Sequence, residues 1–445
     1  MSKEIVIVGG VAAGMSAASK LRREDKDVNI TVYEKGNIVS YGACGLPYFI
    51  SDKIKESKSL IVKNPKDFEK NNITVKTEHE VKNLDADNKN LLIEDLKSNN
   101  TFEKEYDQLV ITTGASPVLP NIKGKELDGI YTLRDVNDGE KIKKEALDDN
   151  IKNVAIIGAG YIGLELCESF IEQGKNVKLI NRSDKIMKTY DDELRELLLE
   201  ELENKGVKMH LSDEIKAFNG NKKVQSIKTD KDTYEADLVI VSIGVKPNSE
   251  FIKNTDIKTL KNGAIIVDKK MKTNIDDVYA AGDVATVYHK VLKENRHIPL
   301  ATYANKQGKL LGEILAGKDT YFEGGIGTSI VKVMDITLAQ TGINENDAKS
   351  YGIDYKTTFI KTGNHAGYYP GNTPVYIKYI YDKNSKILLG AQLAGKSGVA
   401  NRINVLSLAI DKKMTTEEIA YSDFSYAPPF SGVWDALQVA ASASK

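Results

Sequence analysis

The chain has 445 residues and a mass of 49.1 kDa, which exceeds what one hydrophobic core usually supports, so two or three domains are expected. Lys and Arg number 62 against 63 Asp and Glu, and no basic block could follow a phosphate backbone, which argues against a nucleic-acid function. No apolar run is long enough to span a bilayer and no cleavable leader is recognisable, so we expect a cytoplasmic protein. The two cysteines, Cys44 and Cys167, fit a reducing compartment.

The N-terminal segment predicts a strand over residues 4–8, a glycine-rich turn, a helix to about Arg23 and a second strand over 29–34. The turn, Gly-Gly-Val-Ala-Ala-Gly over 9–14, matches the dinucleotide fingerprint except at Val11, where a middle glycine is usual. Glu34 ends the second strand, where a carboxylate can accept both ribose hydroxyls of a nucleotide. An ordinary acidic strand end is the alternative interpretation.

Cys44 follows in the segment Ser-Tyr-Gly-Ala-Cys-Gly-Leu-Pro-Tyr over 40–48. The flanking glycines allow close approach by another group, and a helix N-terminus there would lower the pKa of the thiol. We therefore predict a redox role, whereas Cys167 is interpreted as a small core residue. Phe49 stands five residues after Cys44, where a dithiol enzyme carries its second cysteine. Cys44 must therefore cycle through a mixed disulfide with a small thiol or through a sulfenic acid.

The same pattern returns near residue 153, with a strand over 154–157, a turn over 158–163, a helix to about Gln173 and a strand over 176–181. This turn, Gly-Ala-Gly-Tyr-Ile-Gly, is a complete fingerprint in its proper context, and it predicts pyrophosphate binding at the helix N-terminus. Asn181 ends the following strand and cannot repel the 2′-phosphate of NADP, which Arg182 can bind. We expect NADPH to be accepted at least as well as NADH. If Arg182 points into solvent and Asn181 only caps the strand, both cofactors are usable.

Later segments complete the predicted organisation. Apolar strands near 109–111 and 238–241 each lead into a glycine turn, and residues 277–283 predict a strand, a turn and a helix start. Asp283 would bond the sugar-alcohol chain of a bound flavin, although an exposed loop aspartate is the alternative. From about residue 327, strands over 329–333, 355–361 and 375–381 and helices over 401–411 and 433–442 predict a separate α+β region. The five histidines lack metal-ligand spacing, so no metal is assigned.

The predicted fold class is α/β, with two Rossmann-like dinucleotide-binding domains and a C-terminal α+β dimerisation domain. The expected bounds are 1–115 with 245–322 for a discontinuous FAD-binding domain, 116–244 for an NAD(P)-binding domain and 326–445 for the C-terminal domain.

These features together resemble the single-cysteine flavoproteins of the pyridine nucleotide-disulfide oxidoreductase family, and the branch that reduces coenzyme A disulfide is the most similar. The resemblance covers essentially the whole chain, and its specific parts are the Cys44 segment, Tyr-Tyr-Pro-Gly-Asn over 368–372 and Tyr-Ala-Pro-Pro over 426–429. It implies a homodimer in which the C-terminal domain of one subunit closes the active site of the other. Hydride would pass from NADPH or NADH to FAD, and reducing equivalents then to Cys44, which rests as a mixed disulfide with coenzyme A.

The resemblance also assigns individual residues. Tyr368 and Tyr426 would reach in from the partner subunit as proton donors, and Tyr161 would cover the nicotinamide. The implied cofactor-binding residues are Gly9, Gly14, Glu34, Lys35, Val81, Thr113, Gly114, Gly158, Gly160, Tyr161, Ile162, Gly163, Asn181, Arg182, Tyr190, Gly244, Asp283 and Ala301. The implied coenzyme A contacts are Ser16, Lys20, Arg23 and Ser40, whereas Asn71, Asn305 and Trp434 replace basic residues of the family's site.

Three other functions stay open at this point. NADH oxidases and peroxidases are similar too, but they carry a histidine in the first glycine turn, where this chain has Ala12. Reduction of coenzyme A persulfide or of polysulfide would use the same thiol. A flavin redox sensor or electron-transfer protein is a third alternative, and Cys44 argues against it because such proteins need no thiol at that position.

Overall fold

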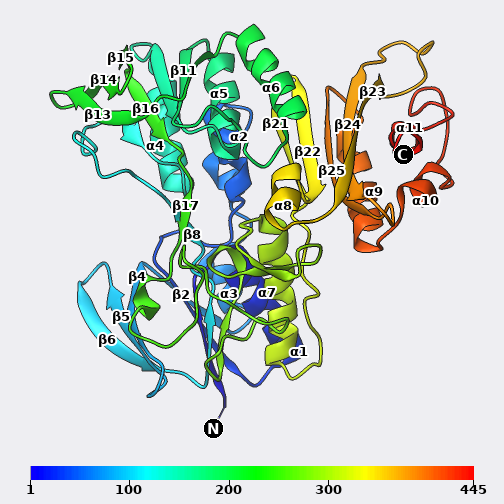
Figure 1. Cartoon of the computed structure of the whole chain (residues 1–445). Helices are drawn as coiled ribbons and strands as arrows, with labels where there is room; N and C mark the ends of the chain where they lie inside the picture. The colour runs from blue at the N-terminus through cyan, green and yellow to red at the C-terminus, as the bar shows by residue number, and fades with distance from the viewer. Residues whose placement is uncertain (1) are drawn as a thin grey trace.

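A parallel five-stranded sheet forms the lower part of the molecule in Figure 1. The structure is a computed structural model that describes residues 2–445. The sheet has the order β18-β7-β1-β2-β3, and its strands are β1 (Glu4–Val8), β2 (Asn29–Glu34), β3 (Ile73–Thr77), β7 (Gln108–Ile111) and β18 (Val278–Ala280). Almost every side chain of β1 and β7 is buried, as expected of parallel strands covered on both faces. Two distant stretches of the chain therefore build one sheet.

Two helices from those distant stretches pack closely on this sheet. They are α1 (Ala12–Glu24) and α7 (Ala301–Leu315). A Cβ atom added at Gly308 would lie 2.3 Å from the Ala13 carbonyl oxygen, and one at Gly312 would lie 2.7 Å from that of Ala17. The two helices can approach this closely because both positions lack a side chain. The short helix α3 (Pro65–Glu69) and an antiparallel sheet of β4 (His79–Asp85), β5 (Asn90–Asp95) and β6 (Asn100–Glu105) complete the region.

A second parallel sheet, above the first in Figure 1, repeats the strand order of the first except at the edge strand, which is β9 in place of β18. Its order is β12-β11-β10-β16-β9, and its strands are β9 (Ile130–Tyr131), β10 (Asn153–Ile157), β11 (Asn176–Asn181), β12 (Lys208–Leu211) and β16 (Leu238–Val241). The helices are α4 (Val136–Ala146), α5 (Tyr161–Glu172) and α6 (Asp192–Asn204), and β13 (Ile215–Gly220), β14 (Val224–Thr229) and β15 (Thr233–Glu235) form a small sheet. The chain crosses between the two regions at β8 (Ala115–Pro117) and β17 (Val245–Pro247), which pair antiparallel.

The C-terminal region is an antiparallel sheet with helices, coloured yellow to red in Figure 1. The strands are β21 (Ser329–Val333), β22 (Ile336–Gly342), β25 (Leu388–Gly395), β24 (Pro374–Asp382) and β23 (Tyr355–Gly363), given in sheet order. The helices are α8 (Glu345–Ser350), α9 (Val399–Asp411), α10 (Thr416–Ala420) and α11 (Ala436–Ser442), and the hairpin β19 (Val287–His289) and β20 (Glu294–Arg296) precedes the region.

The expected α/β class and the repeated nucleotide-binding unit are confirmed. The exact domain bounds given above stay a prediction, which the crossing at β8 and β17 supports. The last helix begins at Ala436 rather than at residue 433, because the Asp435 carboxylate accepts from the Leu437 backbone N–H at 2.9 Å and caps the helix there. No helix within residues 2–445 is both long and apolar enough to cross a membrane.

A buried lysine connects the region of the second parallel sheet, called the second region, with the C-terminal region. The Lys378 side chain on β24 is fully buried, and its ammonium group binds Glu193 of α6 at 2.6 Å and also Glu345 of α8, while Asp191 lies 3.5 Å away. Burial lowers the pKa of Lys378, but the hydrogen bonds to these carboxylates outweigh burial and raise it. The ammonium group therefore stays charged, and it holds α6 against the C-terminal sheet.

We predict that Lys378→Met lowers the free energy of unfolding by roughly 3–5 kcal/mol, because it leaves the buried Asp191 and the partly buried Glu193 and Glu345 without their counter-charge. The matched control is Lys349→Met, since the Lys349 side chain is 67% exposed and pairs with Glu345 at 3.5 Å. That change should cost under about 1 kcal/mol. Urea unfolding followed by circular dichroism measures both, and equal losses would contradict the prediction.

Candidate active site

At the first and last glycines of both glycine-rich turns, neighbouring backbone leaves no room for a side chain. Gly9 and Gly158 have φ angles of 105° and 104°, which side chains rarely adopt. A Cβ atom on Gly9 would lie 2.2 Å from the Thr112 carbonyl oxygen, and one on Gly158 would lie 2.3 Å from that of Ser242. The last glycines of the two turns, Gly14 and Gly163, are equally restricted, because their Cβ atoms would lie 2.0 and 2.2 Å from the carbonyl oxygens of Gly9 and Gly158.

Gly160 differs from these glycines. A Cβ atom added there would have no neighbour within 4 Å among the described residues, so packing within the chain does not require a glycine. Gly160 directly precedes the first residue of α5, where the backbone N–H groups of a helix attract anions. A side chain at this position would occupy the space that a dinucleotide pyrophosphate needs, so the turn fits that group.

The two β-strand ends that follow the turns are built alike but carry different side chains. The Glu34 carboxylate accepts from the backbone N–H groups of Gly10 and Gly36 at 2.6 and 2.7 Å. The Asn181 amide oxygen accepts from the Ala159 N–H at 3.3 Å, and its NH₂ group donates to the Ser183 carbonyl at 2.8 Å. A carboxylate has about four acceptor sites, so Glu34 can still accept from ribose hydroxyls.

Arg182 is free to meet a ligand. Its side chain is 80% exposed, and its nearest carboxylate is Glu214 at 3.6 Å. Asn181, in contrast, is engaged within its own loop, which agrees with the alternative that this residue caps the strand.

Asp283 holds an unused acceptor in the first region. Its Oδ1 atom is buried and has no hydrogen-bond partner among the described residues, and burial raises the pKa of the carboxyl group. The Gly282 N–H donates to the Gln307 side-chain oxygen at 2.9 Å, which fixes the loop on α7. A buried oxygen without a partner fits the hydroxyl groups of a flavin's sugar-alcohol chain, because it can accept a hydrogen bond from them.

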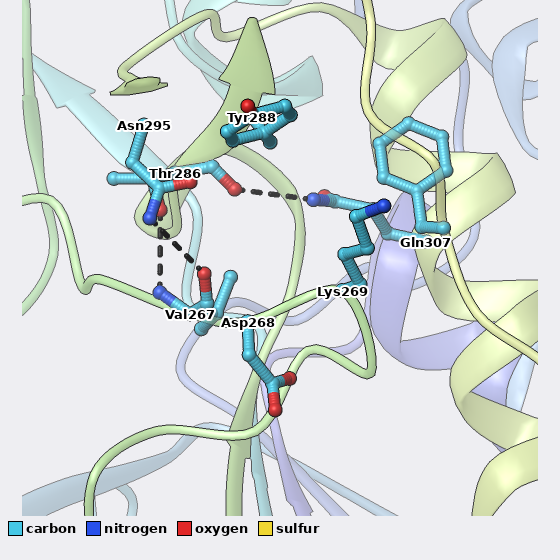
Figure 2. A pocket seen from close by; sticks show the side chains of 8 residues that line it. Val267, Asp268, Lys269, Thr286, Tyr288, Asn295 and Gln307 are labelled. Atoms are coloured by element: carbon cyan, nitrogen blue, oxygen red, sulfur yellow. Dashed lines mark hydrogen bonds between the residues drawn. The ribbon is translucent and has the colours of Figure 1, made fainter. Parts of the chain in front are cut away.

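A separate cavity has a volume of about 300 Å³. Its lining residues include Gln307, Thr286, Tyr288 and Asn295 (Figure 2). Its polar groups already pair with one another, since the Gln307 amide donates to the Thr286 carbonyl at 3.3 Å and the Asn295 amide to the Val267 carbonyl at 3.3 Å. We therefore centre the site on Cys44 and not on this cavity.

Cys44 lies in a short 3₁₀ helix over 43–45, directly before α2 (Leu46–Ile50). Helix α2 is bound to α5 of the second region, because the Pro47 carbonyl accepts from the Ser169 hydroxyl at 3.0 Å and the Ile50 carbonyl from the Gln173 amide at 2.6 Å. Cys44 is exposed, whereas Cys167 on α5 is fully buried. Only Cys44 is therefore placed to react.

We expected a lowered pKa for the Cys44 thiol, but this expectation is wrong, because its surroundings in the chain raise the pKa. Burial of the sulfur raises the pKa although the residue as a whole is exposed, and the charges of Glu165 and Asp283 raise it further. A backbone N–H opposes these effects more weakly. Helix α2 has five residues, too few to build up a dipole that would outweigh two nearby carboxylates.

Glu165 is a site residue that the sequence reasoning missed. Burial and the neighbouring Glu168 raise its pKa to about 7, so it changes charge near neutral pH beside Cys44. The signal for it was its position one helical turn after Tyr161, which puts both side chains on one face of α5.

Tyr161, the first residue of α5, is half-buried. Its hydroxyl pairs with the Ser329 hydroxyl at 2.9 Å and accepts from the Gln340 amide at 3.2 Å. Tyr190 was expected to bind the cofactor, but its side chain is fully buried. It belongs to the core cluster against which Tyr161 packs, and its contact with the cofactor stays a prediction.

Tyr368 and Tyr426 are brought together by the fold. Their hydroxyl groups are 2.7 Å apart, and this hydrogen bond raises the pKa of Tyr426. The Tyr368 side chain is 76% exposed and that of Tyr426 44%. The segments that carry them, between β23 and β24 and between α10 and α11, lie on the outer side of the C-terminal region, away from α2 (Figure 1).

The expected coenzyme A contacts lie on or near α1 and are only partly available. Lys20 is engaged, because its ammonium group binds Glu24 and also Glu313 at 2.9 Å. The Ser16 hydroxyl donates to the Asn305 side chain at 3.0 Å. Arg23 is exposed and Ser40 is half-buried. Arg23 is therefore the one of these basic groups that remains open to a ligand.

The remaining predicted cofactor contacts lie around the two turns. Lys35 pairs with Glu80 at 2.7 Å, Val81 is buried, and the Thr113 hydroxyl donates to the Asn248 carbonyl at 2.7 Å. Gly114 and Gly244 have positive φ angles, Ile162 is half-buried, and Ala301 is the exposed first residue of α7. Within residues 2–445 there is no cluster of three or more His, Cys, Asp or Glu side chains arranged to hold a metal ion.

Comparison with known proteins identifies two family models along the chain. The model described as pyridine nucleotide-disulphide oxidoreductase matches residues 3–308, and the model for the dimerisation domain of the same family matches residues 328–437.

Three relatives are similar over the whole length of the chain. Coenzyme A disulfide reductase of Staphylococcus aureus is 36% identical over 438 residues, which cover 98% of each protein. An NAD-dependent persulfide reductase from A. fulgidus is 36% identical, with a TM-score of 0.95 and coverage of 99% of this chain and 82% of that one. An engineered water-forming NADPH oxidase, derived from an NADH oxidase of Lactobacillus brevis, is 30% identical, with a TM-score of 0.95 and coverage of 99% and 98%.

We predict that Glu165→Gln lowers the pKa of the Cys44 thiol, because it removes a negative charge that opposes the thiolate. The alkylation rate of the reduced protein by iodoacetamide should rise several-fold at pH 8, where the Glu165 carboxyl, with its pKa of about 7, is ionised. At pH 5.5, where Glu165 is protonated in the wild type, the two proteins should differ little.

Glu172→Gln is the matched control for this experiment, since Glu172 lies two turns further along α5 and pairs with Lys53 at 2.7 Å. An equal pH profile for wild type and Glu165→Gln would show that the Glu165 charge does not act on Cys44.

Proposed function

Because the chain belongs to the pyridine nucleotide-disulphide oxidoreductase family, whose members use FAD and NAD(P)H, we propose that it reduces a low-molecular-weight disulfide, most favourably coenzyme A disulfide, through Cys44. One observation carries this proposal. Cys44 is exposed and the other cysteine, Cys167, is buried in the core, so the chain has no second thiol with which Cys44 could close an internal disulfide. The partner sulfur must come from a substrate.

The reaction follows from this arrangement. FAD, when bound, supplies the transfer of two electrons from the nicotinamide to the oxidised Cys44 sulfur. In the oxidised enzyme, Cys44 holds a mixed disulfide with coenzyme A, and its reduction breaks the S–S bond and releases one thiol. The free Cys44 thiolate then attacks coenzyme A disulfide, which expels the second thiol and restores the mixed disulfide. Overall, one NADPH and one proton convert one disulfide into two thiols.

Protonation of the leaving thiolate is assigned to the pair Tyr368 and Tyr426. Their hydroxyls are hydrogen-bonded at 2.7 Å, and both side chains are exposed on the region that matches the dimerisation domain. In a homodimer, this exposed pair would enter the partner's active site next to Cys44 and act as the general acid.

A persulfide of coenzyme A is the second candidate substrate. The persulfide reductase from A. fulgidus is as similar in sequence as the coenzyme A disulfide reductase from S. aureus, at 36% identity. The thiolate of Cys44 would attack the outer sulfur atom of the persulfide, break its S–S bond and release the coenzyme A thiol, which leaves a persulfide on Cys44. The two substrates therefore leave different groups on Cys44.

We expect the oxidised protein, analysed by mass spectrometry without reductant, to carry an adduct of the mass of coenzyme A on Cys44 that NADPH removes. Cys44→Ser should lose the adduct and the disulfide reduction but keep flavin reduction by NADPH, since a hydroxyl forms no disulfide. Cys167→Ala is the control and should retain both activities. A single added sulfur would favour the persulfide, and a single added oxygen the oxidase chemistry.

We also propose that the protein accepts NADPH at least as well as NADH. The engineered NADPH oxidase carries three consecutive changes, aspartate to alanine, alanine to arginine and methionine to serine. This chain has Asn181, Arg182 and Ser183 in that order after its second fingerprint. A further change of that enzyme, proline to arginine, follows the serine by five positions, where this chain has Lys188. A neutral strand end followed by exposed cations suits a 2′-phosphate.

We predict that wild type has at least as high a kcat/KM with NADPH as with NADH, and that Arg182→Ala lowers the NADPH value by about ten-fold to a hundred-fold, the value of a charge-assisted bond. The NADH value should change little. Lys185→Ala is the matched control, since Lys185 is half-exposed and pairs with Asp192 at 3.5 Å. A wild type that strongly prefers NADH would refute the assignment of Arg182.

A further inference from the structure

The Tyr161 hydroxyl is held by two side chains from the C-terminal region. Ser329 on β21 and Gln340 on β22 are direct cross-strand partners, so their side chains leave the same face of the sheet. Both hydrogen-bond the phenol oxygen, at 2.9 and 3.2 Å. A tyrosine at the start of α5 in one region is thereby fixed by a different region of the chain.

Among Tyr161, Ser329, Gln340 and their neighbour Tyr190, the Tyr190 hydroxyl is left without a hydrogen-bond partner. The Gln340 amide can only donate through its nitrogen, so the phenol oxygen accepts that bond and its O–H is free to donate to the Ser329 oxygen. The Tyr190 hydroxyl lies beside the hydroxyls of Tyr161 and Ser329. It is fully buried, yet it has no hydrogen-bond partner of acceptable geometry within residues 2–445. A buried hydroxyl in this condition is costly and favours any rearrangement that pairs it.

We propose that Ser329 exchanges hydrogen-bond partners, holding Tyr161 in the closed position and pairing with Tyr190 when the Tyr161 ring moves aside for the nicotinamide. The proposal rests on the function proposed above and on the role expected of Tyr161 from the family resemblance, in which its ring covers the nicotinamide site. Gln340 stabilises only the closed position, whereas Tyr190 stabilises only the open one. These are positioning residues, because each acts through Tyr161 and not on the cofactor.

The exchange would give the buried, unpaired Tyr190 hydroxyl beside Tyr161 a role, because it gains a partner when the Tyr161 ring moves. Opening breaks two hydrogen bonds to Tyr161 and makes one between Ser329 and Tyr190. The C-terminal region therefore sets the equilibrium between the two positions, and the apparent affinity for the dinucleotide depends on the fraction of open sites.

Titration of the oxidised, FAD-loaded dimer with NADP⁺ by isothermal calorimetry tests the exchange without turnover. Gln340→Met removes a bond made only in the closed position, so NADP⁺ should bind about five-fold more tightly, the effect of one hydrogen bond. Tyr190→Phe removes the bond of the open position and the idle hydroxyl of the closed one, so NADP⁺ should bind about five-fold more weakly. In a Ser329→Ala background, Tyr190→Phe should have no effect on binding.

Thr337→Ala is the matched control. Side chains alternate between the two faces of a strand, and Thr337 stands three positions before Gln340 on β22, so it points to the opposite face. It should bind NADP⁺ as wild type does. Wild-type affinity in both Gln340→Met and Tyr190→Phe, or a loss in Tyr190→Phe that persists beside Ser329→Ala, would overturn the exchange. If the wild type bound no NADP⁺ at all, the proposed function itself would fail and the exchange with it.

Discussion

One buried carboxylate fixes the three regions relative to one another. The Glu168 side chain on α5 is 6% exposed and binds Lys53 of the first region at 3.0 Å and Lys332 of the C-terminal region at 2.6 Å. It also accepts the Met334 backbone N–H at 2.7 Å. An ionised group in this position must keep its partners, because leaving it unpaired would be strongly destabilising. This contact therefore helps to hold Cys44, the second nucleotide-binding turn and the C-terminal sheet in their relative positions.

Helix α5 carries out this role through the spacing of a single helix face. Tyr161, Glu165 and Glu168 follow at intervals of four and three residues, so they lie above one another on the helix. The Tyr161 hydroxyl is hydrogen-bonded to Ser329 and Gln340. The Glu165 charge raises the pKa of Cys44. Glu168 joins its own region to the other two. The helix that follows the second nucleotide-binding turn thus also raises the pKa of a thiol that another region supplies. The polypeptide raises the pKa of Cys44, so the position of the thiol, and not its acidity in the free chain, is what the fold provides.

Local sequence was sufficient for the elements and for the nucleotide turns, because fully buried parallel strands read as continuous apolar runs and Gly9 and Gly158 need φ angles that other residues avoid. It was insufficient wherever a residue's environment comes from a distant part of the chain. The expectation of a low thiol pKa was wrong because burial of the sulfur raises the pKa, as do the charges of Glu165 and Asp283, which lie more than a hundred positions after Cys44. The full burial of Tyr190 and the hydrogen bonds that engage Asn181 in its own loop were likewise not visible in the sequence. No periodicity or motif carries that information.

The first sheet takes β18 from far downstream of its other strands, so it cannot be completed until residues beyond the second sheet have been made. When the ribosome has released residues 1–250, the strands β9, β10, β11, β12 and β16 of the second sheet are all present. The first sheet still lacks its edge strand, and α1 still lacks α7, whose two glycines fit against it. The domain that begins the chain is consequently the later one to mature, and α1 exposes its apolar face to solvent until residue 315 emerges. Asp283, the predicted contact of the flavin's sugar-alcohol chain, arrives in the same late segment, after the whole second sheet has been made.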